Sequence, residues 1–147
     1  MRVWVDADGC PVVDLTVRLA REAGLPVTLV CDAAHEMARY PDTETLTVPT
    51  GADSADWALL GRVAAGDVVV TQDYGLAALC LAKGARPIRQ DGVCYTEHNI
   101  DALLEQRHWA GRIRRSGGRL KGPKRRTRDQ DEYFSAALRR LLEQETT

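Results

Sequence analysis

A short strand that ends in two acidic residues constrains the fold of this chain more than any other feature. Val3 and Val5 alternate with other residues across positions 2–6, and this pattern predicts a buried strand. Asp6 and Asp8 close the strand, and a glycine and a proline follow within three residues, as at a tight turn that starts a helix. We therefore expect two carboxylates at the carboxyl end of a strand, where open α/β sheets bind their ligands.

Runs of strand length alternate with amphipathic helical patterns along the whole chain. This alternation predicts an α/β fold, with a parallel central sheet of about four or five strands that is flanked by helices on both faces. A length of 147 residues fits a single domain, 1–147. The patterns predict strands at 2–6, 25–30, 45–48, 68–70 and 85–89, and helices at 12–23, 53–65, 73–83, 97–107 and 129–145. Trp57 and Tyr133 are assigned to the apolar faces of the second and the last helix.

Five acidic residues follow or flank the ends of the expected strands. Asp6 and Asp8 follow the first strand, Asp73 follows strand 68–70, and Asp53 and Asp56 stand at the start of the helix between them. The carboxyl ends of parallel strands lie at one edge of a sheet, so these side chains should meet if their strands are neighbours. Such a cluster is repulsive unless a cation or a proton lies within it. Mg²⁺ or Mn²⁺, which prefer oxygen ligands, would make it useful for hydrolysis of a phosphodiester.

Four of the five acids also have a structural explanation when they are taken alone. Asp8 could cap the following helix while Asp6 faces solvent, and Asp53 and Asp73 stand where helix caps are common. Only the joint placement of the five residues favours a site.

The distribution of charge is strongly uneven, although the net charge is only −1. Residues 1–106 carry 8 Lys and Arg against 16 Asp and Glu, whereas residues 107–128 carry 10 Lys and Arg and no acid. Glycines and a proline predict that the basic segment, about 107–128, is a loop. The alternative is that the segment folds back onto the acidic body of its own or a neighbouring subunit. Several Lys and Arg side chains in contact with phosphate would give the chain affinity for a polyanionic partner. The candidate phosphate-binding or nucleic-acid-binding residues are Arg112, Arg114, Arg115, Arg119, Lys121, Lys124, Arg125, Arg126 and Arg128.

Nothing in the sequence predicts a membrane segment or a zinc site. No apolar run of about 18 residues occurs, and the first residues lead straight into a strand without a signal-peptide pattern. The four cysteines are scattered without a Cys-x-x-Cys pair, which favours reduced thiols and a cytoplasmic location.

Several longer motifs together resemble one known family. They are Val5-Asp-Ala-Asp-Gly-Cys-Pro11, Gly51-Ala-Asp-Ser-Ala-Asp56, Gly66-Asp-Val-Val-Val-Thr-Gln-Asp-Tyr-Gly-Leu-Ala-Ala78, Tyr95-Thr-Glu-His-Asn-Ile100, Arg114-Arg-Ser-Gly-Gly118 and Gly122-Pro123. In these motifs the chain resembles the YaiI/YqxD family of small bacterial proteins (DUF188, UPF0178), which is assigned to the PIN-like superfamily. The resemblance extends to about Leu142.

The resemblance implies a three-layer PIN-like fold and a metal-dependent ribonuclease site, although the family is largely uncharacterised. Thr71 would then orient a water molecule or a carboxylate. The implied catalytic and metal-binding residues are Asp6, Asp8, Asp53, Asp56 and Asp73.

Three hypotheses about function follow. The first is an Mg²⁺-dependent or Mn²⁺-dependent nuclease, a hydrolase that acts on RNA rather than DNA. The second is a non-catalytic protein that binds nucleic acid through the basic segment. The third is a phosphatase for small molecules, because Asp6-Ala-Asp-Gly9 is similar to the opening motif of haloacid-dehalogenase-like phosphatases, although Cys10 and Pro11 depart from that motif. The closing amphipathic helix also offers a surface for a homodimer.

Overall fold

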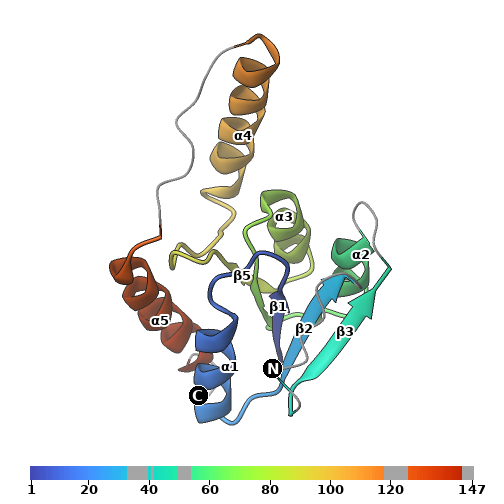
Figure 1. Cartoon of the computed structure of the whole chain (residues 1–147), viewed down its shortest axis with the longest axis vertical. Helices are drawn as coiled ribbons and strands as arrows, with labels where there is room; N and C mark the ends of the chain where they lie inside the picture. Colours follow the sequence, from blue (N-terminus) through green and yellow to red (C-terminus); the bar gives the residue numbers. More distant parts are fainter. Residues whose placement is uncertain (33–39, 41, 50–53, 118–125, 144–147) are drawn as a thin grey trace.

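A computed structural model describes residues 1–32, 40, 42–49, 54–117 and 126–143 (Figure 1). Its five strands form one parallel sheet in the order β3-β2-β1-β4-β5. The strands are β1 (Val3–Asp6), β2 (Val27–Asp32), β3 (Glu44–Val48), β4 (Val68–Val70) and β5 (Arg86–Ile88). The helices are α1 (Val13–Glu22), α2 (Ser54–Leu60), α3 (Tyr74–Ala82), α4 (Ile100–Arg115) and α5 (Arg128–Glu143).

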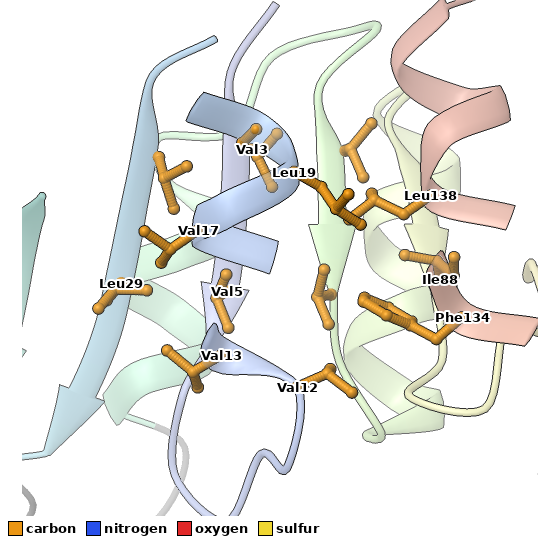
Figure 2. Packing of buried hydrophobic residues seen from close by; sticks show 14 of the residues in the cluster. Val3, Val5, Val12, Val13, Val17, Leu19, Leu29, Ile88, Phe134 and Leu138 are labelled. Atoms are coloured by element: carbon orange, nitrogen blue, oxygen red, sulfur yellow. The ribbon is translucent and has the colours of Figure 1, made fainter. Parts of the chain in front are cut away.

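The helices cover both faces of the sheet, so the predicted three-layer α/β arrangement is confirmed. Helices α1 and α5 pack on one face, where Val3 and Val5 of the central strand point (Figure 2). Helices α2 and α3 pack on the other face, where Trp4 points. The alternation of β1 thus sends each side chain to the core that the sequence pattern predicted. No helix in the described part of the chain is long and apolar enough to cross a membrane.

Helix α5 is fixed on the body at both of its ends. Phe134 is fully buried and lies beside Val12 and Ile88 in the core (Figure 2). Near its start, the helix backbone passes so close to Gly92 that a Cβ there would come within 2.7 Å of the Tyr133 carbonyl carbon and oxygen. Near its end, the Leu141 carbonyl oxygen accepts a hydrogen bond of 2.8 Å from Arg86 Nη1.

Helix α4 is attached to the body mainly through its first half. Ile100 packs with Ala77 and Tyr95, and Leu103 and Leu104 are half-buried against the same group. Beyond these residues the helix extends away from the sheet (Figure 1).

Two predicted helices have different ends in the structure. The helix predicted at 53–65 ends at Leu60, and the chain turns there to bury Val63. The helix predicted at 97–107 begins at Ile100 and runs to Arg115. The first part of the basic segment is therefore helical rather than a loop, because Gly111 alone does not break the helix and the next glycine is Gly117.

Two aromatic side chains were assigned to the wrong face. Trp57 is 68% exposed and Tyr133 is 65% exposed. The buried side of the short α2 is set by Leu59, and a residue two positions away points in nearly the opposite direction. Helix α5 buries positions 134, 137, 138, 141 and 142, a helical stripe that leaves position 133 outside.

Candidate functional site

The order of the strands reverses between β1 and β4, the position at which open α/β sheets have a crevice for ligands. From β1 the chain proceeds through β2 to β3 on one side, whereas β4 and β5 lie on the other side. At such a reversal the helices leave opposite faces of the sheet, and ligands bind beyond the carboxyl ends of the two strands. Asp6 is the last residue of β1 and Thr71 is the first residue after β4, so the two flank this crevice.

Thr71 joins the two strand ends. Its hydroxyl Oγ1 donates a hydrogen bond of 2.9 Å to Asp6 Oδ2 and accepts one of 3.0 Å from the backbone N–H of Asp73. The side chain of Thr71 is only 2% exposed, and its backbone carbonyl accepts a hydrogen bond of 3.1 Å from the buried Tyr95 hydroxyl. Thr71 therefore orients one carboxylate and fixes the backbone of a second acid.

The carboxyl group of Asp6 is strongly perturbed. Burial raises its pKa to about 6, the hydrogen bond from Thr71 lowers it, and the negative charges of Asp73 and Asp8 raise it again. Two of the other predicted acids thus act electrostatically on Asp6, as expected if the strands are neighbours.

Asp8 does not cap α1, the structural role considered for it from the sequence. The N-cap position of α1 is Val12, which makes no capping hydrogen bond through its side chain. Asp8 Oδ2 instead accepts a hydrogen bond of 3.0 Å from the backbone N–H of Asp32, at the end of β2. This bond is possible because the turn after β1 passes through Gly9 with a φ of +70°, a conformation that suits glycine. Asp8 therefore ties the turn after β1 to the next strand.

Asp73 combines a structural role with its position at the crevice. It is the N-cap of α3, and its Oδ1 accepts a hydrogen bond of 3.1 Å from the backbone N–H of Leu76. The helix cap considered from the sequence is therefore present, and it holds this carboxyl group at the carboxyl edge of the sheet beside Thr71.

Asp56 lies in the first turn of α2. Burial raises the pKa of the Cys80 thiol to about 12, Lys83 lowers it, and Asp56 and Asp6 both raise it. Asp56 and Asp6 therefore both act electrostatically on the Cys80 thiol. Asp53 lies outside the described residues, so its predicted place at the site remains a prediction.

The donor chemistry suits a hard cation held by few protein ligands. Within the described ranges, no three His, Cys, Asp or Glu side chains are grouped closely enough to hold a metal ion by themselves. Mg²⁺ does not require such a cage, because it usually binds to one or two carboxylates and completes its coordination with water and substrate phosphate. Asp6 and Asp73, linked through Thr71, are the residues that would hold it, with Asp8 nearby.

The basic segment is divided between two places in the structure. Arg112 and Arg115 are exposed on the outer half of α4. Arg126 lies at the other end of the segment, where its Nη2 forms an ion pair of 2.6 Å with Asp131 Oδ1. Arg128 is exposed at the first residue of α5. Arg119, Lys121, Lys124 and Arg125 and the side chain of Arg114 lie outside the described part of the chain.

The charge of Arg126 acts on a thiol in the turn that carries the acids. Burial raises the pKa of the Cys10 thiol to about 11, Asp6 raises it as well, and Arg126 lowers it. An acid of the candidate site and a cation of the basic segment therefore have opposite effects on the pKa of the same thiol.

One cluster beside the site was not found by sequence reasoning. Arg89 follows β5, pairs with Asp91 at 2.8 Å through both Nε and Nη2, and donates a hydrogen bond of 3.0 Å from Nη1 to the Tyr74 hydroxyl. Tyr74 makes an edge contact with Tyr95, the residue that donates to the Thr71 carbonyl. The sequence could have indicated Arg89 because it immediately follows a strand, at the same edge of the sheet as the acids.

The chain matches one family of proteins. The model of a family described as uncharacterized, the YaiI/YqxD family (DUF188), matches residues 4–144. A UPF0178 protein from Exiguobacterium sibiricum is 54% identical over 146 residues, which are 99% of this chain and 99% of that relative. A UPF0178 protein from Clostridium acetobutylicum is 48% identical over 145 residues, 97% of each chain. Among solved structures, Rae1 (YacP) from Bacillus subtilis (W164L mutant) is similar with a TM-score of 0.41 and 16% identity, over 98% of this chain and 99% of that one.

Proposed function

This chain belongs to the uncharacterized YaiI/YqxD (DUF188, UPF0178) family, and we propose that it is a divalent-metal-dependent nuclease that hydrolyses RNA phosphodiesters. The observation that carries this proposal is the joining of Asp6 and Asp73 through the Thr71 hydroxyl, at the crevice between β1 and β4. Carboxylates brought together at the reversal point of a parallel sheet are suited to cation-assisted chemistry on phosphate. The PIN-like kinship that the family resemblance implies favours RNA over DNA.

Each residue of the candidate site would have its own role in this reaction. Thr71 keeps the Asp6 carboxyl oriented through the 2.9 Å hydrogen bond, and α3 holds Asp73 through the bond to Leu76 N–H. Mg²⁺ or Mn²⁺ bound by Asp6 and Asp73 would supply an activated water and offset the charge of the phosphodiester. Asp8 keeps the turn after β1 against β2, so that Asp6 stays at the crevice.

The direct test is cleavage of a labelled single-stranded RNA with and without Mn²⁺, with the products separated on a gel. We expect metal-dependent cutting by the wild-type protein and a loss of about 1,000-fold in Asp6→Asn and in Asp73→Asn, because a metal centre supplies several kcal/mol of transition-state stabilisation. Glu22→Gln is the matched control, since Glu22 is exposed at the end of α1, which runs away from the acids. Full activity in both aspartate variants would contradict the proposal.

A second function is favoured by one observation. Arg112, Arg115 and Arg128 are exposed cations of the basic segment, and they would also serve a protein that binds nucleic acid without cutting it. That protein would retain RNA in a filter-binding assay, with an affinity that falls steeply with salt, and would give no product with Mn²⁺. Release of inorganic phosphate from a small phosphate ester, without cutting of RNA, would instead support the phosphatase hypothesis.

A further inference from the structure

The described arginines at the two ends of the basic segment form two separate surfaces. The outer surface consists of Arg112 and Arg115, which with Ile113 and Ser116 line a shallow depression on the far half of α4. The inner surface consists of Arg126 and Arg128, where the chain returns to the body at the start of α5.

The outer surface lies well beyond the candidate site. Helix α4 has 16 residues, and its first residue, Ile100, is packed against α3. At 1.5 Å per residue, Arg112 and Arg115 lie roughly 20 Å further along the helix axis. The outer half extends away from the rest of the molecule (Figure 1). Its charges are therefore displayed away from the acidic body of the same chain, which argues against the expectation that they simply fold back onto it.

The inner surface lies beside the acids because α5 is docked there. Phe134 of α5 packs beside Val12, which closely follows the turn that carries Asp8 (Figure 2). Arg126 is held in this region by its ion pair with Asp131. Arg126 thus acts electrostatically on the turn after β1, and Arg112 and Arg115 lie roughly 20 Å beyond Ile100 along α4.

We propose that the two cationic surfaces bind the backbone of one RNA molecule at two points, so that the candidate site acts on polynucleotides and discriminates against short oligonucleotides. This inference rests on the proposed nuclease function. The acids of the crevice repel a polyanion, so binding must come from cations elsewhere along its backbone. A span of roughly 20 Å corresponds to about six base pairs of a duplex, at about 3.4 Å per base pair.

The test is a series of single-stranded and duplex RNAs of increasing length, from about 4 to about 30 nucleotides. We expect kcat/KM of the wild-type protein to rise at least about tenfold once the RNA can reach the outer surface, and then to level off. The double variant R112A/R115A should lose this rise and cleave the shortest RNAs as the wild-type protein does.

The matched control is R139A/R140A, which removes two exposed arginines from the last turns of α5. It should keep the dependence on length. The salt dependence of binding to a long single strand should become shallower by about 0.7 for each phosphate contact that R112A/R115A loses, and should stay unchanged in the control. Circular dichroism checks that both variants are folded.

Failure of this inference is distinguishable from failure of the proposed function. Cleavage that is independent of length, or equal behaviour of the two double variants, would overturn the inference and leave the nuclease intact. If no RNA is cut at any length, the nuclease proposal fails, and affinity as a function of length then tests the two surfaces alone. A change of oligomeric state in R112A/R115A, with unchanged RNA binding, would assign the outer surface to a second copy of the chain and overturn the inference.

Discussion

The two ends of the central strands both carry aspartates, but in opposite surroundings. At the amino end of β4, Asp67 is 7% exposed and accepts three hydrogen bonds. They come from the Arg2 N–H at 3.0 Å, the Trp4 Nε1–H at 2.9 Å and the Ala64 N–H at 2.9 Å. Asp67 thereby joins β1, β4 and the turn before β4.

At the carboxyl end, Asp6 accepts a hydrogen bond from Thr71 and is surrounded by the charges of Asp73 and Asp8. Both Asp6 and Asp67 are removed from solvent to a large degree, so burial alone does not separate a structural carboxylate from a reactive one. The neighbouring groups distinguish the two roles. Three hydrogen-bond donors give Asp67 a structural role, whereas the nearby carboxylates make Asp6 suited to bind a cation.

The largest effect on stability is expected at the amino end. Asp67→Ala leaves three donors without their acceptor, and should lower the free energy of unfolding by about 4 kcal/mol. Asp6→Asn removes a buried charge that like charges disfavour, and should not lower it. Urea denaturation followed by circular dichroism measures both changes. Equal losses in the two variants would remove the distinction between the two ends.

A bound metal ion should affect only the carboxyl end. Mg²⁺ or Mn²⁺ at about 100 times its dissociation constant should raise the stability of the wild-type protein by about 2.7 kcal/mol, seen as a higher Tm. Asp73→Asn should lose this gain. Asp67→Asn should have a lower Tm without metal but show the same increase when metal is added. A gain that persists in Asp73→Asn would place the ion elsewhere.

The pH dependence without metal gives a third contrast. Since the pKa of Asp6 is raised from 3.8 to about 6, the folded chain keeps this proton at pH values where the unfolded chain has lost it. The unfolded state binds fewer protons in this pH window. The free energy of unfolding should therefore fall by about 2 kcal/mol as the pH rises through the window.

Asp6→Asn should remove this fall, while Glu22→Gln should not. The measurement is urea denaturation in EDTA between about pH 4 and about pH 7. Parallel curves for the wild-type protein and Asp6→Asn would show that Asp6 titrates normally.

The smallest effect is expected for the exposed tryptophan near the carboxyl end. Trp57 lies next to Asp56 and is 68% exposed, so Trp57→Ala should change the free energy of unfolding by less than about 0.5 kcal/mol. Trp4→Phe, at the amino end, leaves Asp67 without one donor and should cost about 1 kcal/mol. A large loss for Trp57→Ala would indicate that this side chain is covered in solution.

The sequence was sufficient to predict a parallel sheet flanked by helices, with acids at the ends of two of its strands, but it did not predict the order of the strands. The alternation of Val3 and Val5 and the apolar run of β4 identify two buried strands, and both are followed by an aspartate. Parallel strands then bring the two acids to one edge, whatever the details of the loops.

Other parts of the site depend on contacts between residues that are far apart in the chain. The hydrogen bond from Asp32 N–H to Asp8 requires the register of β1 with β2, which no local pattern specifies. The nearness of Arg126 to Cys10 requires the docking of α5 on α1. The exposure of Trp57 follows from the early end of α2 at Leu60, whereas the sequence pattern favours a longer helix.

The place of α5 as the last helix along the chain has a consequence for the order of assembly. Asp6, Asp8 and Asp73 are all synthesised before it, but one face of the sheet lacks Phe134 and Leu138 until α5 arrives. Docking of α5 buries Val12 beside the acidic turn and brings Arg126 back to it at the same time. Without docked α5 the acids therefore lack this cation, so one helix completes both the core and the site.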